Sequence, residues 1–226
     1  MKIRAAECRV RKAIRPQSWA VVTDFDATIT DRDAGDTLLL HFGICTPEEI
    51  NRSYGKSVVL EEWMKRVFRR VRLSDSRIAG FVRNSIRIRP GFMQFVSFCR
   101  KKGIPLEIVS GGLDVYAAPF FNRWRIKGVK SYMGKTRREG QGLRVSYPFL
   151  KGLKLDEFKA HRVRVLKRNG YRVLFMGDGT ADFPGAKAAD AVFSRLRLHK
   201  LCREGGVKTR KLTDFHAVRR FLQVHS

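Results

Sequence analysis

Acidic residues are scarce in this sequence. It has 21 aspartates and glutamates against 47 lysines and arginines, which gives a formal net charge of +26. Such an excess attracts polyanions, and nucleic acid is the first partner that it suggests. The basic residues recur from Lys2 to Arg220 instead of collecting in one tail, so many are expected on solvated helix faces. A positive surface would also attract small phosphorylated substrates, so charge alone does not separate a nucleic-acid-binding protein from an enzyme that acts on phosphates.

Long apolar runs and paired cysteines are missing too. No stretch reaches the roughly 18 apolar residues of a membrane-spanning helix, and the run from Trp19 to Thr23 is interrupted by Asp24. We therefore expect no signal peptide, no anchor and no membrane partner. The four cysteines stand singly at positions 8, 45, 99 and 202 and form no metal-binding or redox motif. They fit a reduced, cytoplasmic setting best.

Core material, in contrast, is plentiful. Hydrophobic residues make up 43% of the 226 residues, and 16 of them are phenylalanines. This composition is typical of a packed globular protein. The length suffices for one sizeable core, or for a core domain that carries a smaller inserted one.

Strand-like and helix-like patterns alternate along the chain. Apolar runs predict strands before Asp24, at Ile104–Val109, at Tyr171–Met176 and at Ala191–Ser194, with helical patterns between them. The alternation indicates an α/β fold with a doubly wound parallel sheet. Residues 128–155 are rich in glycine and basic residues, show only short strand-like pieces at 131–133 and 143–147, and receive no assignment.

A stretch of about sixty residues near the N-terminus shows helical patterns only. Helices are predicted over residues 33–42, from Pro47 with Thr46 as N-cap, over 60–71 and over 75–86. We therefore predict a basic N-terminal arm at 1–18, a core formed by 19–31 and 90–226, and a small helical cap at 32–89.

Polar, glycine-rich turns are predicted after three of the strands. They are Asp24-Phe25-Asp26, Ser110-Gly111-Gly112 and the segment from Gly177 to Asp182. The carboxyl ends of parallel strands lie at one edge of a sheet, so these turns can converge on one crevice. Two close carboxylates at a buried strand end repel each other and call for a cation, a shared proton or a reactive role. The alternative is that Asp24 and Asp26 only cap the following helix or form a turn.

The chemistry of the other two turns favours a phosphate and a metal ion. A Ser-Gly-Gly turn offers a hydroxyl and free N–H groups, which suit a phosphate. Asp178 adds an oxygen ligand to the pair Asp24 and Asp26, and such hard ligands suit Mg²⁺.

Together these segments resemble the four ordered motifs of the haloacid dehalogenase superfamily of phosphatases. The motifs are Asp24-Phe25-Asp26-Ala27-Thr28, Ser110-Gly111, a lysine on the helix before the third strand (Lys159), and Gly177-Asp178 with Asp182. The helical insert is similar to the cap of the phosphoserine-phosphatase-like branch. Within that branch, residues 89–121 most resemble the methionine-salvage phosphatases that act on 2-hydroxy-3-keto-5-methylthiopentenyl 1-phosphate.

The resemblance implies a role for each motif residue. Asp24 would be the nucleophile that forms an aspartyl-phosphate, and Asp26 would be the general acid and base. Mg²⁺ would be held by the Asp24 side chain, the Asp26 carbonyl and Asp178, with Asp182 behind them. The residues expected to bind the phosphate are Thr28, Ser110, Gly111 and Lys159. Lys159 could instead be an ordinary surface lysine, as Lys151 and Lys154 are nearby.

Several positions depart from the family pattern or stay open. Ala27 stands where glycine or serine is commoner, and Asp33 stands where phosphoserine phosphatases tend to carry a glutamate that engages the substrate amine. The shorter acid argues against phosphoserine. Arg66 in the cap could clamp a phosphate or carboxylate, or could be a surface arginine. The middle segment lacks the cysteines of the methionine-salvage relatives, which leaves the substrate open.

The sequence thus predicts an Mg²⁺-dependent phosphomonoesterase for a small phosphorylated metabolite. The alternatives are a phosphoserine-phosphatase-like enzyme and a nucleic-acid-binding protein on the same scaffold, the latter suggested by the charge of +26. The oligomeric state is open, with a homodimer among the possibilities.

Overall fold

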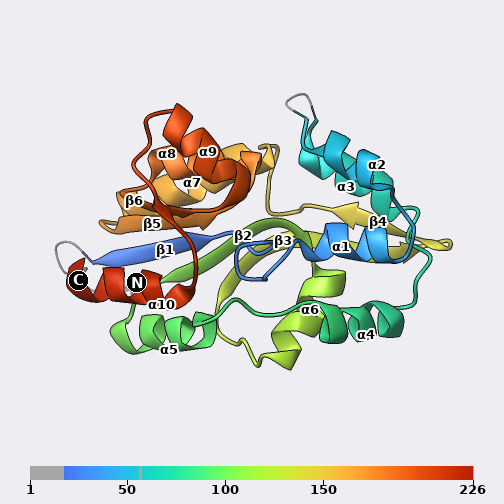
Figure 1. Ribbon diagram of the computed structural model, residues 1–226, viewed down its shortest axis with the longest axis horizontal. Coiled ribbons are helices and arrows are strands. Elements are labelled where there is room, and N and C mark those ends of the chain that lie inside the picture. The colour runs from blue at the N-terminus through green and yellow to red at the C-terminus, as the bar shows by residue number, and fades with distance from the viewer. Residues whose placement is uncertain (1–17, 56–57, 226) are drawn as a thin grey trace, which may run out of the picture.

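A seven-stranded sheet forms the centre of the molecule in the computed structural model, which describes residues 18–55 and 58–225 (Figure 1). In chain order the strands are β1 (Trp19–Thr23), β2 (Leu106–Leu113), β3 (Lys130–Glu139), β4 (Gly142–Ser146), β5 (Arg172–Gly177), β6 (Ala191–Ser194) and β7 (Arg210–Lys211). Their order across the sheet is β4-β3-β2-β1-β5-β6-β7. All neighbours are parallel except β3 and β4. The predicted α/β fold is confirmed.

Helices cover both faces of this sheet, as a doubly wound fold requires. Figure 1 shows α7 (Leu155–Arg168), α8 (Phe183–Ala188) and α9 (Leu196–Glu204) on one face. The other face carries α5 (Phe92–Lys102), α6 (Asp114–Arg123) and α10 (Phe215–His225). The central strand β1 is buried along its whole length, which explains its continuous apolar run. No helix of the described residues is long and apolar enough to cross a membrane.

Four helices fill the stretch between β1 and α5. They are α1 (Ala34–His41), α2 (Pro47–Ser53), α3 (Leu60–Phe68) and α4 (Asp75–Ser85). The predicted start of α2 is confirmed, because Thr46 and Glu49 form a reciprocal capping box ahead of Pro47. Among the described residues of this stretch, the only β pairing is an isolated bridge between Thr30 and Ile88. The division into core and cap stays a prediction, and the predicted arm lies outside the described residues except for Ser18.

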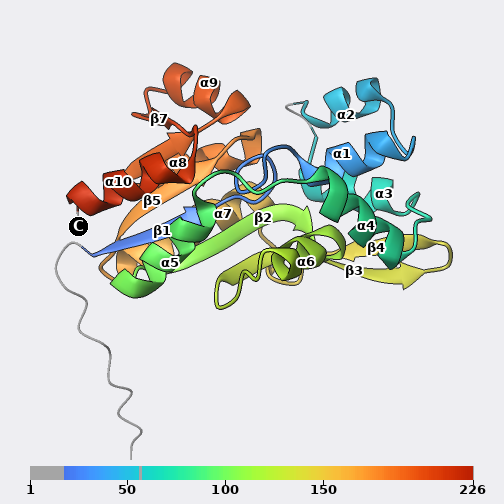
Figure 2. The same ribbon diagram turned by 60° about the horizontal axis from the view of Figure 1, so that its bottom comes forward.

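The segment left unassigned in the sequence is an antiparallel hairpin of β3 and β4. Most side chains of β3 are exposed, so it lacks the apolar alternation that marks a half-buried strand. Figure 2 shows this hairpin beside α3 and α4, and α3 contacts β4. Gly142 permits the contact, since a Cβ there would overlap the carbonyl oxygen of Arg69.

One predicted turn is part of a strand instead. Ser110, Gly111 and Gly112 belong to β2, which continues to Leu113, and helix α6 begins at Asp114. The pairing of β2 with β3 shifts register between Val109 and Leu113, so this part of the strand is irregular. Glycine punctuation predicted a turn here, but in a strand it marks a close approach of other groups.

Candidate active site

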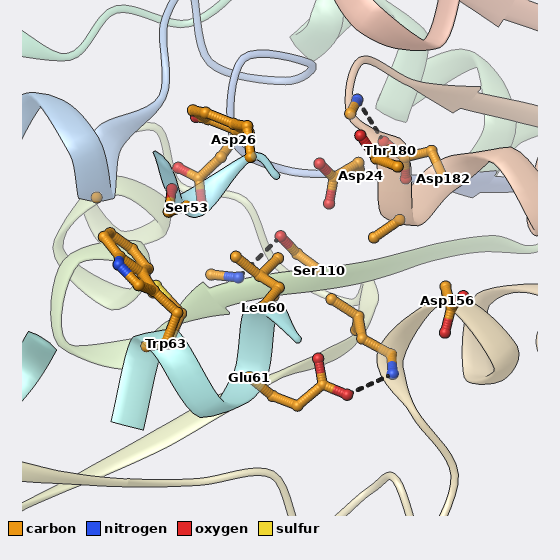
Figure 3. A pocket seen from close by; sticks show the side chains of 18 of the residues that line it. Asp24, Asp26, Ser53, Leu60, Glu61, Trp63, Ser110, Asp156, Thr180 and Asp182 are labelled. Carbon is orange, nitrogen blue, oxygen red and sulfur yellow. Dashed lines mark hydrogen bonds between the residues drawn. The ribbon is translucent and has the colours of Figure 1, made fainter. Parts of the chain in front are cut away.

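A cavity of about 460 Å³ opens where β1, β2 and β5 end. These three strands are neighbours in the sheet, with β1 in the middle, so the predicted convergence of their carboxyl ends is realised. The opposite wall comes from residues in the segments 53–55 and 58–64. Figure 3 shows Leu60 and Trp63 of that wall across from Asp24 and Asp26.

The lining of this cavity is strongly acidic although the whole chain is basic. It includes eight of the 21 acidic residues but only two of the 47 basic residues, Lys154 and Lys159. Buried carboxylates that outnumber their cations raise each other's pKa and attract a positive ion.

Asp24 lies at the end of β1 and is paired with Lys159 of helix α7. Lys159 Nζ is 3.0 Å from Asp24 Oδ1 and 2.5 Å from Asp182 Oδ1, and the lysine is 2% exposed. Lys159 is therefore no surface lysine. Burial raises the pKa of Asp24 to about 6, while the positive charge of Lys159 opposes that rise. Burial would lower the pKa of Lys159, but the carboxylates of Asp182 and Asp24 raise it above its usual value.

Asp26 is held by two donors from different elements. The backbone N–H of Ala34, at the start of α1, donates to Asp26 Oδ1 at 2.9 Å, and the hydroxyl of Tyr116 on α6 donates to Oδ2 at 3.1 Å. Burial raises the pKa of Asp26 well above its usual value, and the charges of Asp33 and Asp24 add to the rise. The side chain is thus fixed in direction and inclined to hold a proton.

Asp24, Asp178 and Asp182 form a cluster that could hold a metal ion. One carboxylate oxygen from each lies within 4.8 Å of the others. Burial raises the pKa of Asp178, and the charges of Asp24 and Asp182 add to the rise, as expected for carboxylates that lie close together. A buried set of hard oxygen donors fits Mg²⁺.

Within this cluster the carboxylate oxygens of Asp182 already accept hydrogen bonds from other groups of the protein. Its Oδ2 accepts the backbone N–H groups of Asp178 at 3.0 Å and Gly179 at 2.9 Å, and its Oδ1 faces Lys159. Asp182 thus shapes the loop that carries Asp178 and is the less available ligand. Thr28 also supports that residue, because its hydroxyl donates to Asp178 Oδ1 at 3.2 Å.

Ser110, Gly111 and Gly112 line the cavity beside the aspartates. Gly112 is necessary there, because a Cβ at this position would be 2.5 Å from Asp26 Oδ2. The hydroxyl of Ser110 accepts the N–H of Gly112 at 3.1 Å, and its own hydrogen bond to the Asp24 carboxylate lowers the pKa of Asp24. This part of the cavity can offer a hydroxyl to an anion.

Three of the predicted site residues have different surroundings from those expected. Thr28 is fully buried against Asp178 and is not among the described residues that line the cavity. Arg66 is exposed on α3 and is not among them either. Asp33 does line the cavity, but its Oδ1 caps α1 by accepting the N–H of Asp36 at 2.7 Å. Burial, together with the charge of Asp36, raises the pKa of Asp33 to about 8.

Sequence reasoning missed Tyr116 and Glu61. Tyr116 was only one of several aromatic residues on a predicted helix, and its partner Asp26 is 90 positions away. Glu61 is a buried cap-side carboxylate whose Oε1 accepts the N–H of Leu155 at 2.9 Å, at the first residue of α7. Nothing in the local sequence distinguishes it from the neighbouring Glu62.

A sequence profile described as haloacid dehalogenase-like hydrolase matches residues 21–187, which is most of the chain. The chain belongs to the haloacid dehalogenase-like hydrolase family. The family resemblance and the enzyme class expected from the motifs are thereby confirmed, and the order of the motifs within 21–187 agrees with them.

The chain also resembles curated members of the family. A 2-hydroxy-3-keto-5-methylthiopentenyl-1-phosphate phosphatase from Bacillus velezensis is 28% identical over 207 residues, which cover 88% of this chain and 87% of the relative. The enzyme of the same name from Geobacillus kaustophilus is 30% identical over 202 residues, covering 86% and 91%.

Solved structures of the family share the fold. A substrate-bound phosphoserine phosphatase superposes with a TM-score of 0.71 at 14% identity, over 92% of this chain and 99% of that one. A family hydrolase from Salmonella enterica also gives 0.71, at 15% identity, over 90% of this chain and 70% of that one.

Proposed function

We propose that this protein is an Mg²⁺-dependent phosphomonoesterase that works through an aspartyl-phosphate on Asp24. The observation that carries the proposal is the ion pair between Asp24 and Lys159, both buried, with Asp26 beside them on the same cavity. A carboxylate fixed by a lysine stays ionised and points in one direction, which a nucleophile requires. The family membership supports a hydrolase.

The reaction follows from the positions of the two acids. One oxygen of Asp24 attacks phosphorus, the bond from phosphorus to the substrate oxygen breaks, and Asp26 gives its proton to the departing oxygen. Asp26 then takes a proton from a water that attacks phosphorus, which breaks the bond to Asp24 and releases phosphate. The donors Ala34 and Tyr116 keep Asp26 in place for both steps.

The remaining motif residues bind the phosphoryl group or the metal. Lys159, the hydroxyl of Ser110 and the N–H of Gly111 would neutralise its oxygens. Asp24, Asp178 and the carbonyl of Asp26 would hold Mg²⁺, and Asp182 would support Asp178. When bound, Mg²⁺ supplies positive charge that offsets the negative charge of the phosphoryl group.

The cavity wall favours a substrate with an apolar part. Val58, Val59, Leu60, Trp63 and Met64 form the side opposite the aspartates. This agrees with the methylthio group in the name of the curated relatives' substrate, which we take as the best candidate.

Phosphoserine is less well accommodated. Its carboxylate would need a basic partner, and among the described residues that line the cavity Lys154 is the only basic one besides Lys159, with no arginine to form a two-point contact. The three described cysteines are buried and unpaired, which supports our expectation of a cytoplasmic protein. The nucleic-acid alternative stays untested.

A phosphatase assay with a matched variant pair tests the proposal. We expect the protein to hydrolyse an aryl phosphate and, in a screen of phosphorylated metabolites, to prefer the methylthiopentenyl substrate. Activity should disappear with a chelator and in Asp24→Asn. The control is Asp156→Asn, because Asp156 also lines the cavity but bonds only to its neighbour Glu157. Full activity in Asp24→Asn would refute the mechanism.

A further inference from the structure

A single helical turn follows Asp24 and ends inside the protein. The carbonyl of Phe25 accepts the N–H groups of Thr28, Ile29 and Thr30 at 3.3, 2.9 and 3.1 Å. The carbonyls that close such a turn have no partner within it. The residues 24–30 are all buried, and a buried carbonyl without a partner is unfavourable. Partners for these carbonyls must come from elsewhere.

Arg89 supplies hydrogen-bond donors to the four carbonyls that end the turn, those of residues 27–30. The guanidinium of Arg89 donates through Nη2 to Ala27 at 2.9 Å and Thr30 at 2.8 Å, and through Nε to Thr28 at 2.7 Å. Its backbone N–H donates to Ile29 at 2.8 Å. Arg89 is 6% exposed, and no ion pair found among the described residues includes it. A buried guanidinium is therefore committed to backbone carbonyls of this turn.

The turn needs this support because its conformation is unfavourable at Ala27. The φ angle of Ala27 is 49°, in the left-handed region where a Cβ is crowded. A second guanidinium reaches the same carbonyl, since Arg195 Nη1 donates to Ala27 at 2.5 Å. A residue keeps such a conformation only where its surroundings fix it.

The turn contacts acidic residues of the site that follow two different strands. Asp26 lies at its start, and Thr28 within it donates to Asp178 on another strand end. We propose that Arg89 is a positioning residue, which holds the turn after Asp24 and so sets the directions of Asp26 and Asp178. Its effect on catalysis rests on the proposed function, but its hold on the turn does not.

Amide hydrogen exchange tests whether Arg89 holds the turn, and it needs no measurement of enzyme activity. The variants are Arg89→Lys, which keeps the charge without the planar fork, and Arg89→Met. The matched controls are Arg87→Lys and Arg87→Met, because Arg87 is exposed two positions earlier. We expect the amides of 28–30 to exchange faster in the Arg89 variants than in the controls, at a temperature where all are folded. Exchange equal to that of the controls would overturn the proposal.

Kinetics then distinguish positioning from a purely structural role. We expect kcat to fall roughly 10- to 100-fold in Arg89→Lys, since small displacements of reacting groups have effects of this size, while KM changes little. The loss should be smaller when Ala27→Gly is also present, because glycine adopts the left-handed conformation without strain. A normal kcat, or the same loss in both backgrounds, would contradict the proposal.

A wild type that cleaves no phosphate ester would refute the proposed function, and the exchange result would still decide the role of Arg89. Should Arg89→Met not fold, Arg89→Lys alone carries the test.

Discussion

At the scale of single residues, the two acids of the site differ in their partners. Asp24 is paired with a cation, Lys159, whereas Asp26 receives two neutral donors. An ion pair favours the charged carboxylate, while burial beside other acids favours the protonated one. The same residue type can therefore serve as nucleophile at one position and as proton donor two positions later.

Tyr116→Phe should lower kcat by roughly tenfold with little change in KM, because a hydrogen bond typically contributes about 0.5–1.5 kcal/mol and a tenfold change in rate corresponds to about 1.4 kcal/mol. The lost donor is the one that orients Asp26 Oδ2. Steady-state kinetics on an aryl phosphate measure it. The control is Tyr171→Phe, at a half-buried tyrosine outside the cavity lining, which should behave as wild type. If Tyr116→Phe retained full kcat, the assignment of Asp26 would lose its support.

At the scale of elements, helices far apart in the chain are linked by single buried contacts. The carboxylate of Glu61 on α3 accepts the N–H of Leu155, the first residue of α7, and α7 carries Lys159. An acidic side chain at a helix N-terminus satisfies an unpaired N–H and interacts favourably with the helix dipole. The wall of the cavity is thus tied to the helix that carries Lys159, the partner of Asp24.

Glu61→Ala should lower the free energy of unfolding by about 2 kcal/mol, since it leaves a buried N–H without a partner. Its neighbour offers a matched control. Glu62 makes only an exposed ion pair with Lys65, so Glu62→Ala should change stability by less than about 0.5 kcal/mol. Denaturant unfolding of both variants measures the difference, and equal values would show that the link between α3 and α7 is not stabilising.

The N-terminus of helix α10 is also stabilised by an acidic side chain, that of Asp214, the residue before the helix. Asp214 Oδ1 accepts the N–H of Ala217 at 2.8 Å, and this hydrogen bond lowers the pKa of Asp214. A lowered pKa contributes stability above the unfolded value, about 3.9, and that contribution is lost as the pH falls through the folded value.

Asp214→Ala should therefore destabilise the protein by about 1 kcal/mol at pH 7, the usual effect of removing an N-cap. The difference from wild type should shrink below about pH 4. Thermal unfolding at a series of pH values measures this. Asp214→Asn keeps an acceptor and should show less loss at pH 7, and a difference between wild type and Asp214→Ala that is constant with pH would argue against the cap.

At the scale of the whole molecule, the charge is divided between the cavity and the rest. Eight acidic residues line a cavity that has two lysines, within a chain of net charge +26. The acids of the lining call for a cation, whereas the exterior attracts anions over a longer range. A phosphorylated substrate would be drawn to the molecule by its exterior and bound in the cavity by the metal and Lys159.

Association with a phosphate ester should accordingly weaken with salt. Between about 0.05 and 0.5 M NaCl, at saturating Mg²⁺, we expect kcat/KM to fall roughly tenfold while kcat stays constant, because salt screens the exterior charge. Unchanged kcat/KM would show that the exterior does not steer the substrate. Inhibition by an oligonucleotide at low salt would instead support the nucleic-acid alternative.

The sequence by itself determined the strands that surround the site and the residues at their ends. Buried parallel strands are continuous apolar runs, and polar residues directly after them must lie at one edge of the sheet. Asp24, Asp26, Ser110 and Asp178 could therefore be chosen without a structure, whereas Lys159 follows only from the resemblance to the family's motifs. Only the tertiary structure decided what supports them.

Tyr116, Glu61 and Arg89 act through contacts that span 59 to 94 positions, and no local pattern encodes such contacts. The exposure of Arg66 and the β3–β4 hairpin were decided in the same way, since both depend on which elements pack together. Local patterns report burial and turn formation, whereas the partner of a side chain is set by the packing of the whole chain.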